Sequence, residues 1–92
     1  MYKHFYTLFG TTEITYREMD DKGNTIVMVE TPDEDIGFKS FEYKIPLNMK
    51  VSSVGFDKNE IELLTYFIKT HIYEILSRAK ELRLEMEMSK NE

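Results

Sequence analysis

A histidine and a glutamate that could bind a metal ion or transfer a proton lie three residues apart near the middle of a predicted helix. His71 and Glu74 would project from the same helical face, and an imidazole beside a carboxylate can hold a metal ion or move a proton. A metal site in a helical scaffold needs further carboxylates from neighbouring helices, and this sequence predicts only one helix. The other histidine, His4, lies in a predicted strand. A metal-dependent or acid–base enzyme is therefore a minor alternative, and we expect His71 to be a boundary residue that pairs with Glu74.

Other short motifs lack parts that their chemistry requires. The segment Asp33–Gly37 begins like a calcium loop, but its sixth position would be Phe38 instead of glycine and its twelfth Lys44 instead of glutamate. The serines have no histidine and acid in a recognisable order. The chain has no cysteine, so it can form neither a thiolate nor a disulfide. We therefore predict no catalytic residue, no metal site and no cofactor.

Acidic side chains are concentrated in one part of the chain. Residues 13–36 hold eight acids and two bases, and the whole chain has a formal net charge of −5. Because phosphate neutralisation dominates affinity for nucleic acids, such a chain without a basic patch is a poor nucleic-acid binder. A solvated hairpin that aids solubility explains the charge. The alternative is an inhibitor that presents an acidic surface to the basic groove of a nucleic-acid-processing protein. That surface would comprise Glu18, Asp20, Asp21 and Asp33.

The C-terminal third predicts one long helix over residues 56–90. Asp57 is a suitable N-cap, and Glu60 three residues later completes a capping box. Phe56 and Ile61 have the spacing of a hydrophobic staple. Apolar residues then recur every three or four positions, without proline or glycine, and so form one face of an amphipathic helix. They are Ile61, Leu64, Ile68, Ile72, Ile75, Ala79, Leu82 and Met86.

Residues 1–54 predict an antiparallel sheet. The alternating segments are Tyr2–Phe9, Glu13–Met19, Thr25–Thr31 and Phe38–Ile45, and Val51–Val54 fits a short fifth strand. Since the first segment is partly apolar on both faces, it suits a central position. The expected fold is a single α+β domain over residues 1–92. It has two layers: a meander of four to five antiparallel strands, and one long C-terminal helix packed on one face.

The predicted helix is longer than the domain that should cover it. About 30 helical residues span about 45 Å, whereas a compact chain of this size is about 30–35 Å across. The turns from Arg78 onward should therefore project, and they either fray or pack against a partner. A sheet face left uncovered by one helix, on which we place Tyr2, Tyr6, Tyr16 and Tyr43, also favours self-association. The predicted interface comprises Tyr66, Tyr73, Ala79, Leu82, Leu84, Met86 and Met88.

These patterns predict a small cytosolic domain that works by binding. The absence of cysteine fits the cytosol, and the first residues lack the apolar run of a signal peptide. No stretch approaches the roughly 20 apolar residues of a membrane span. We expect the domain to act through protein–protein contacts, as a homodimer or with another protein.

Overall fold

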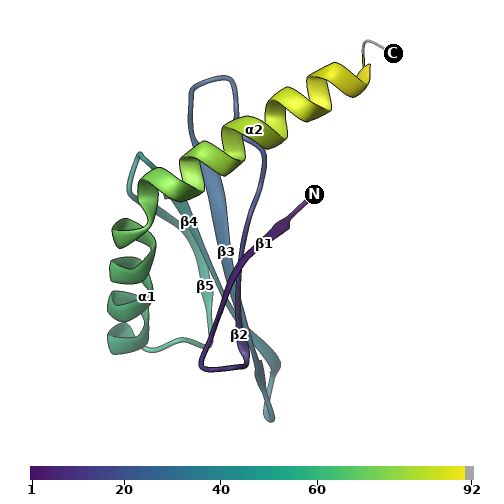
Figure 1. Ribbon diagram of the computed structural model, residues 1–92. Helices are drawn as coiled ribbons and strands as arrows, with labels where there is room; N and C mark the ends of the chain where they lie inside the picture. The colour runs from purple at the N-terminus through teal and green to yellow at the C-terminus, as the bar shows by residue number, and fades with distance from the viewer. Residues whose placement is uncertain (91–92) are drawn as a thin grey trace.

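The computed structural model describes residues 1–90, in which an antiparallel sheet is followed by two helices (Figure 1). The strands are β1 (Lys3–Leu8), β2 (Thr12–Tyr16), β3 (Thr25–Asp33), β4 (Gly37–Ile45) and β5 (Met49–Val54). The helices are α1 (Lys58–Thr70) and α2 (Ile72–Lys90). The two-layer α+β prediction is confirmed, and the fifth strand is present.

The sheet is a simple meander in the order β1-β2-β3-β4-β5, with antiparallel pairing throughout. The prediction that the first strand is central was wrong, because β1 lies at an edge. Its register shifts between His4 and Tyr6, so Phe5 occupies a bulge. The bulge lets two successive aromatic rings, Phe5 and Tyr6, approach Phe67 of α1, at centroid distances of 6.4 and 5.6 Å. This double contact explains the apolar residues on both apparent faces of the strand.

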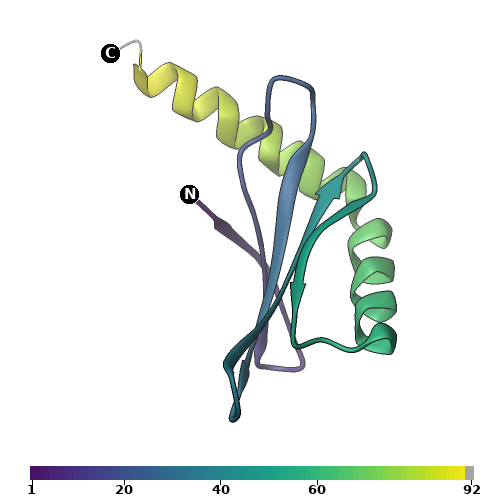
Figure 2. The ribbon, with the colours of Figure 1, turned by 180° about the vertical axis from the view of Figure 1, so that it is seen from behind.

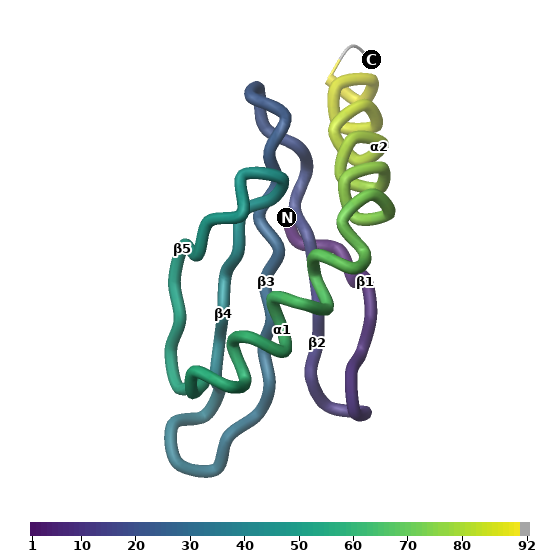
Figure 3. The backbone as a smooth tube through the Cα atoms, turned by 90° about the vertical axis from the view of Figure 1, so that its left-hand side faces the viewer, coloured from purple at the N-terminus to yellow at the C-terminus, as the bar shows by residue number. Residues whose placement is uncertain are grey.

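The helices lie on one face of the sheet (Figure 3). Alternate strand residues fill the core beneath them. The core side chains include Ile14, Val27, Val29, Phe41 and Ile45 from the sheet, and Leu64, Ile68, Ile75, Ala79 and Leu82 from the helices. The prediction of four tyrosines on the uncovered face was wrong for three of them. Tyr16 and Tyr43 are buried in the core, and Tyr6 contacts α1. Only Tyr2 reaches the other face, where its hydroxyl donates to Glu42 at 3.4 Å.

The predicted single helix is divided at His71 and changes direction there, although it is nearly continuous in sequence (Figure 1). In the last turn of α1, side chains form hydrogen bonds with backbone carbonyl oxygens. Thr70 donates from its hydroxyl to the Tyr66 carbonyl at 2.8 Å, and the Nδ1 atom of His71 lies 2.9 Å from the Phe67 carbonyl oxygen. Local bonds of this kind compete with the helical pattern and bend helices. The bend therefore occurs without proline or glycine.

The bend shortens the part of α2 that projects. The backbone N–H of Met19 donates to the Ala79 carbonyl at 3.1 Å, and Ala79 and Leu82 are buried. The expectation that the helix projects from Arg78 onward was therefore wrong, because Ala79 and Leu82 pack in the chain's own core. Seen from behind, the β2–β3 connection crosses α2, and the last turns extend past it (Figure 2). The described chain measures 45 × 23 × 20 Å along its principal axes.

Candidate interaction surface

An apolar groove of about 270 Å³ lies between α1 and the turn that joins β1 to β2. We call it the aromatic groove. Its lining residues are Leu8, Phe9, Leu63, Tyr66, Phe67, Thr70 and His71. The strand and the helix that form its walls are both fixed to the core, β1 through Phe5 and α1 through Leu64 and Ile68. The groove is therefore a preformed feature of the fold.

Phe9 occupies an unusual position at the mouth of the aromatic groove. Its φ angle is +53° and that of Gly10 is +73°, and the N–H of Thr11 donates to the Leu8 carbonyl at 3.1 Å. Positive φ at both central residues is the requirement of a type I′ hairpin turn, which favours Asn-Gly. A left-handed conformation costs a bulky residue about 1–2 kcal/mol. Yet the Phe9 side chain is 79% exposed, so packing within the chain offsets little of that cost.

Further hollows adjoin the aromatic groove on both sides. Phe9 and Leu63 also line a neighbouring hollow that contains Lys39, and Tyr66 lines another that contains Lys69. Leu63 is 55% exposed and Tyr66 is 70% exposed. Each side chain therefore projects between the aromatic groove and one of the neighbouring hollows. The result is a continuous apolar surface along α1 with charged groups at its margins.

The structure does not join His71 to Glu74. The His71 ring packs against Phe67 at a centroid distance of 4.2 Å and against Phe5 at 5.8 Å. Glu74 instead accepts from Arg78 at 2.8 Å, and Arg78 lies over the Phe5 ring at 5.0 Å. Within residues 1–90, no group of three or more His, Cys, Asp or Glu side chains could hold a metal ion. The contacts of His71 are those of a half-buried residue that supports the floor of the groove.

The predicted interface residues have different surroundings. Ala79 and Leu82 are buried in the core, and Met86, 38% exposed, lies beside the β2–β3 loop. Tyr66 lines the aromatic groove. The remaining residues, Tyr73, Leu84 and Met88, are half exposed or more. At about 100° per residue these three fall on the side of α2 opposite Ile75, so they form the outer face of that helix.

Sequence reasoning missed Phe9 and Leu63. The predicted strand Tyr2–Phe9 includes Phe9, but a glycine directly after it is a signal for a two-residue turn. In a helical projection, Leu63 lies beside the apolar stripe of α1. The sequence does not show that the sheet leaves this side of the helix uncovered.

The acidic residues of the predicted set do not form one surface. Asp20 Oδ1 accepts from the backbone N–H groups of Asn24 and Lys22, both at 2.9 Å. These bonds, that of Asn24 foremost, hold the pKa of Asp20 below its ordinary value of 3.8. Asp33 lies at the far end of β3, about 25–30 Å away at the usual rise per residue. Asp33 is therefore too far from Asp20 to belong to the same acidic surface.

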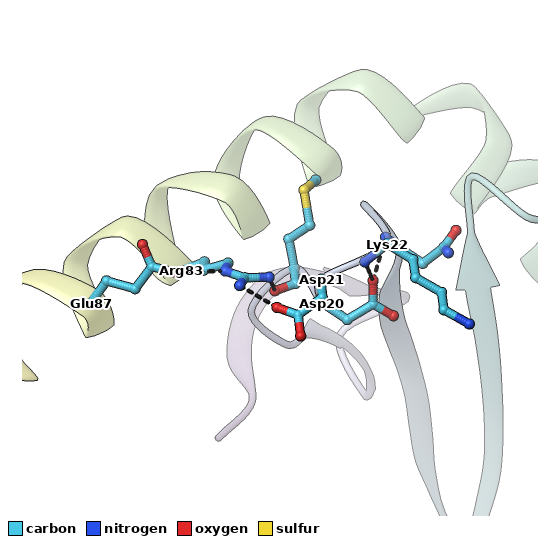
Figure 4. Close-up of polar contacts among 7 residues, drawn as sticks. Asp20, Asp21, Lys22, Arg83 and Glu87 are labelled. Atoms are coloured by element: carbon cyan, nitrogen blue, oxygen red, sulfur yellow. Dashed lines mark hydrogen bonds and ion pairs between the residues drawn. The ribbon is translucent and has the colours of Figure 1, made fainter.

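The other two members of that set are engaged with basic groups. Glu18 is mostly buried and pairs with Arg17 at 3.4 Å. Asp21 accepts from Arg83 of α2 (Figure 4). Arg83 also donates to Glu87 at 2.9 Å, and the bonds to Glu87 and then Asp21 raise the pKa of the guanidinium. The β2–β3 loop is therefore partly neutralised by α2.

Comparison of the chain with protein-family models, with curated proteins and with solved structures gives no match. Neither helix of the described residues is long and apolar enough to cross a membrane. The aromatic groove and its surroundings are therefore the features that bear on function.

Proposed function

We propose that this chain is a small cytosolic binding domain that assembles through protein–protein contacts at the aromatic groove, in the first instance with a second copy of itself. The observation that carries the proposal is the Phe9 ring, held on a left-handed backbone and exposed at the mouth of an apolar groove. Burial of such a ring in an interface would contribute about 1.5–3 kcal/mol. A partner would therefore provide the stabilisation that the isolated chain lacks.

The surroundings of Phe9 resemble the centre of a protein interface. Aromatic side chains dominate interface energetics when they cluster in a pocket and charged groups form the rim. Here Leu63 and Tyr66 stand beside Phe9, and Lys69 lies at the margin. The walls are already in place, so little ordering entropy opposes binding.

The rest of the surface is less suited to assembly. Both edge strands are irregular, since Phe5 bulges in β1 and Val51 has no counterpart in the β4–β5 register. Bulged edges discourage the addition of another strand. The uncovered sheet face is largely polar at its centre, where Thr15 and Glu42 flank Met28. These features favour the helical side of the molecule as the contact surface.

The proposal is tested by measuring mass in solution with light scattering over a wide range of concentration. We expect the mass to rise from 11.0 kDa to twice that value. Phe9→Asn should weaken the association at least tenfold, because asparagine tolerates positive φ but provides no ring. Phe38→Asn is the matched control, since Phe38 is also exposed but does not line the aromatic groove. A chain that is monomeric throughout would contradict self-assembly.

A further inference from the structure

The end of α2 offers apolar side chains that the chain itself leaves unburied. Leu84 and Met88 are four residues apart on the outer face of the helix, and both are at least half exposed. The views from the front and from behind show these last turns extending beyond the sheet (Figures 1 and 2). We infer that the aromatic groove of one copy receives residues 84–88 of a second copy, and that the exchange is reciprocal. This inference rests on the proposed self-assembly.

The exposed areas support a reciprocal contact. The exposed fractions of Phe9, Leu63 and Tyr66 together correspond to about 400–500 Å² of surface, by comparison with the area that a large side chain buries. The exposed parts of Leu84 and Met88, which share the outer face of α2, add about 200 Å². A stable interface buries about 600–1,000 Å² on each partner. Neither surface suffices alone, but the two together, about 600–700 Å², reach the lower end of this range on each copy.

The chemistry of the two surfaces is complementary. An amphipathic helix that lays residues at i and i+4 into an apolar groove is a common recognition mode, and Leu84 and Met88 have this spacing. The flexible methionine thioether adapts to an irregular groove. At the margins, Glu85 of the helix end and Lys69 beside the groove are both exposed. Their opposite charges would favour docking of the helix end into the groove over a contact between two grooves.

The positions of the two surfaces allow a closed dimer. The aromatic groove contains Leu8 and Phe9 from the end of β1, and α2 crosses the beginning of β1, where Arg78 lies over Phe5. The backbone views show the β1–β2 turn and the last turns of α2 at opposite ends of the β1 side of the molecule (Figures 1 and 3). A two-fold axis beside β1 would place each helix end at the groove of the other copy. Such a contact closes on itself, as in most homodimers.

Site-specific crosslinking tests which surfaces meet. The natural chain has no cysteine, so Leu63→Cys and Met88→Cys each introduce a single thiol at an exposed position. We expect a mixture of the two variants to form a covalent heterodimer in high yield under mild oxidation, and each variant alone to form little. A covalent homodimer of Leu63→Cys alone would instead show groove-to-groove pairing and overturn the inference.

Complementation provides a second readout. One chain carries Leu63→Glu and Tyr66→Glu, the other Leu84→Glu and Met88→Glu; all four positions are exposed, and unchanged circular dichroism checks the fold. Each should be monomeric alone, and a mixture should associate measurably more strongly than either chain alone, because only the mixture keeps one of the two contacts intact. Tyr73→Glu, on the same outer face but outside residues 84–88, is the control that should dimerise normally. A mixture that associates no more strongly than either chain alone overturns the reciprocal arrangement.

These experiments separate the two proposals. If the natural chain dimerises and Leu84→Glu with Met88→Glu dimerises equally well, the helix end is not the occupant, and the proposed binding role of Phe9 still stands. If the natural chain is monomeric at every concentration, self-assembly and the reciprocal exchange both fail.

Discussion

Arg83 of α2 binds Asp21 of the β2–β3 loop, and the pair joins positions 62 residues apart in the chain (Figure 4). The same guanidinium donates to the Met19 carbonyl at 3.3 Å, while the Met19 N–H donates to Ala79 at 3.1 Å. The loop is thus attached to the helix on both sides of Met19. Glu87 accepts from Arg83 one turn further on and so orients the guanidinium group.

Removal of this attachment should loosen the loop while the sheet remains intact. We expect Arg83→Met to accelerate hydrogen exchange at the Met19 amide at least tenfold, because local opening of the loop no longer breaks the Arg83 contacts. Arg78→Met is the control: Arg78 pairs within its own helix and should leave that exchange rate unchanged. Equal protection in both variants would show that Arg83 does not hold the loop.

Leu82 should contribute to stability although it lies late in the last helix. Its side chain is buried against the core, so Leu82→Ala should lower the free energy of unfolding by about 2–3 kcal/mol. Met88→Ala, at an exposed position of the same helix, should change it by less than about 0.5 kcal/mol. Urea denaturation of the two variants at low protein concentration measures the difference. Similar values would mean that Leu82 does not pack as described.

Phe9 should combine a binding role with a stability cost. Replacement by glycine relieves the left-handed strain, so Phe9→Gly should raise the free energy of unfolding of the monomer by about 1 kcal/mol. The same change removes the exposed ring and should weaken dimerisation. Phe38→Gly, in a strand, should instead lower stability by about 0.5–1 kcal/mol. Thermal melting of dilute samples and light scattering of concentrated ones report the two effects separately.

Gly55 should tolerate a side chain less well than Gly23. Both have strongly positive φ, +88° and +84°, so alanine is strained at either position by about 1 kcal/mol. A Cβ on Gly55 would also lie 2.7 Å from Ile36 Cδ1 and 2.9 Å from Lys39 Cγ, whereas nothing approaches within 4 Å at Gly23. We expect Gly55→Ala to destabilise the chain by about 1 kcal/mol more than Gly23→Ala does. Chemical denaturation of the pair tests this order.

Asp20 should make stability depend on pH in the acid range. The backbone N–H groups of Asn24 and Lys22 favour its carboxylate, so its pKa in the folded state lies below 3.8. Because the folded pKa is the lower one, the stabilisation is fully present well above pH 3.8 and is lost as the pH falls through the folded pKa. The stability difference between the natural chain and Asp20→Ala should therefore shrink below that pH. NMR titration of the Asp20 carboxyl carbon gives its pKa directly, and a value above 3.8 would contradict the geometry.

Features that depend on neighbours a few residues apart follow from the sequence alone. The capping box is the clearest case: the Glu60 N–H donates to Asp57 at 2.8 Å, and the Asp57 N–H donates to Glu60 at 3.0 Å. Alternation in β4 is likewise local: Phe41, Tyr43 and Ile45 share one face of the strand, and all three are buried in the core. The apolar stripe faces the core on both sides of the bend, since Ile68 before it and Ile75 after it are both fully buried. Caps and side-chain periods follow from local backbone geometry, and the sequence displays that geometry directly.

Which parts of these elements are covered depends on how the elements pack together in three dimensions. The bend at His71 directs α2 across the β2–β3 loop, and this direction buries Ala79 while leaving Phe9 exposed beside α1. The edge position of β1 likewise depends on which strands pair, and its bulge on contacts with Phe67. These outcomes arise from contacts between residues that are distant in sequence. A local pattern of polar and apolar residues shows which face of an element is apolar, but the relative positions of the elements determine whether the chain itself covers that face.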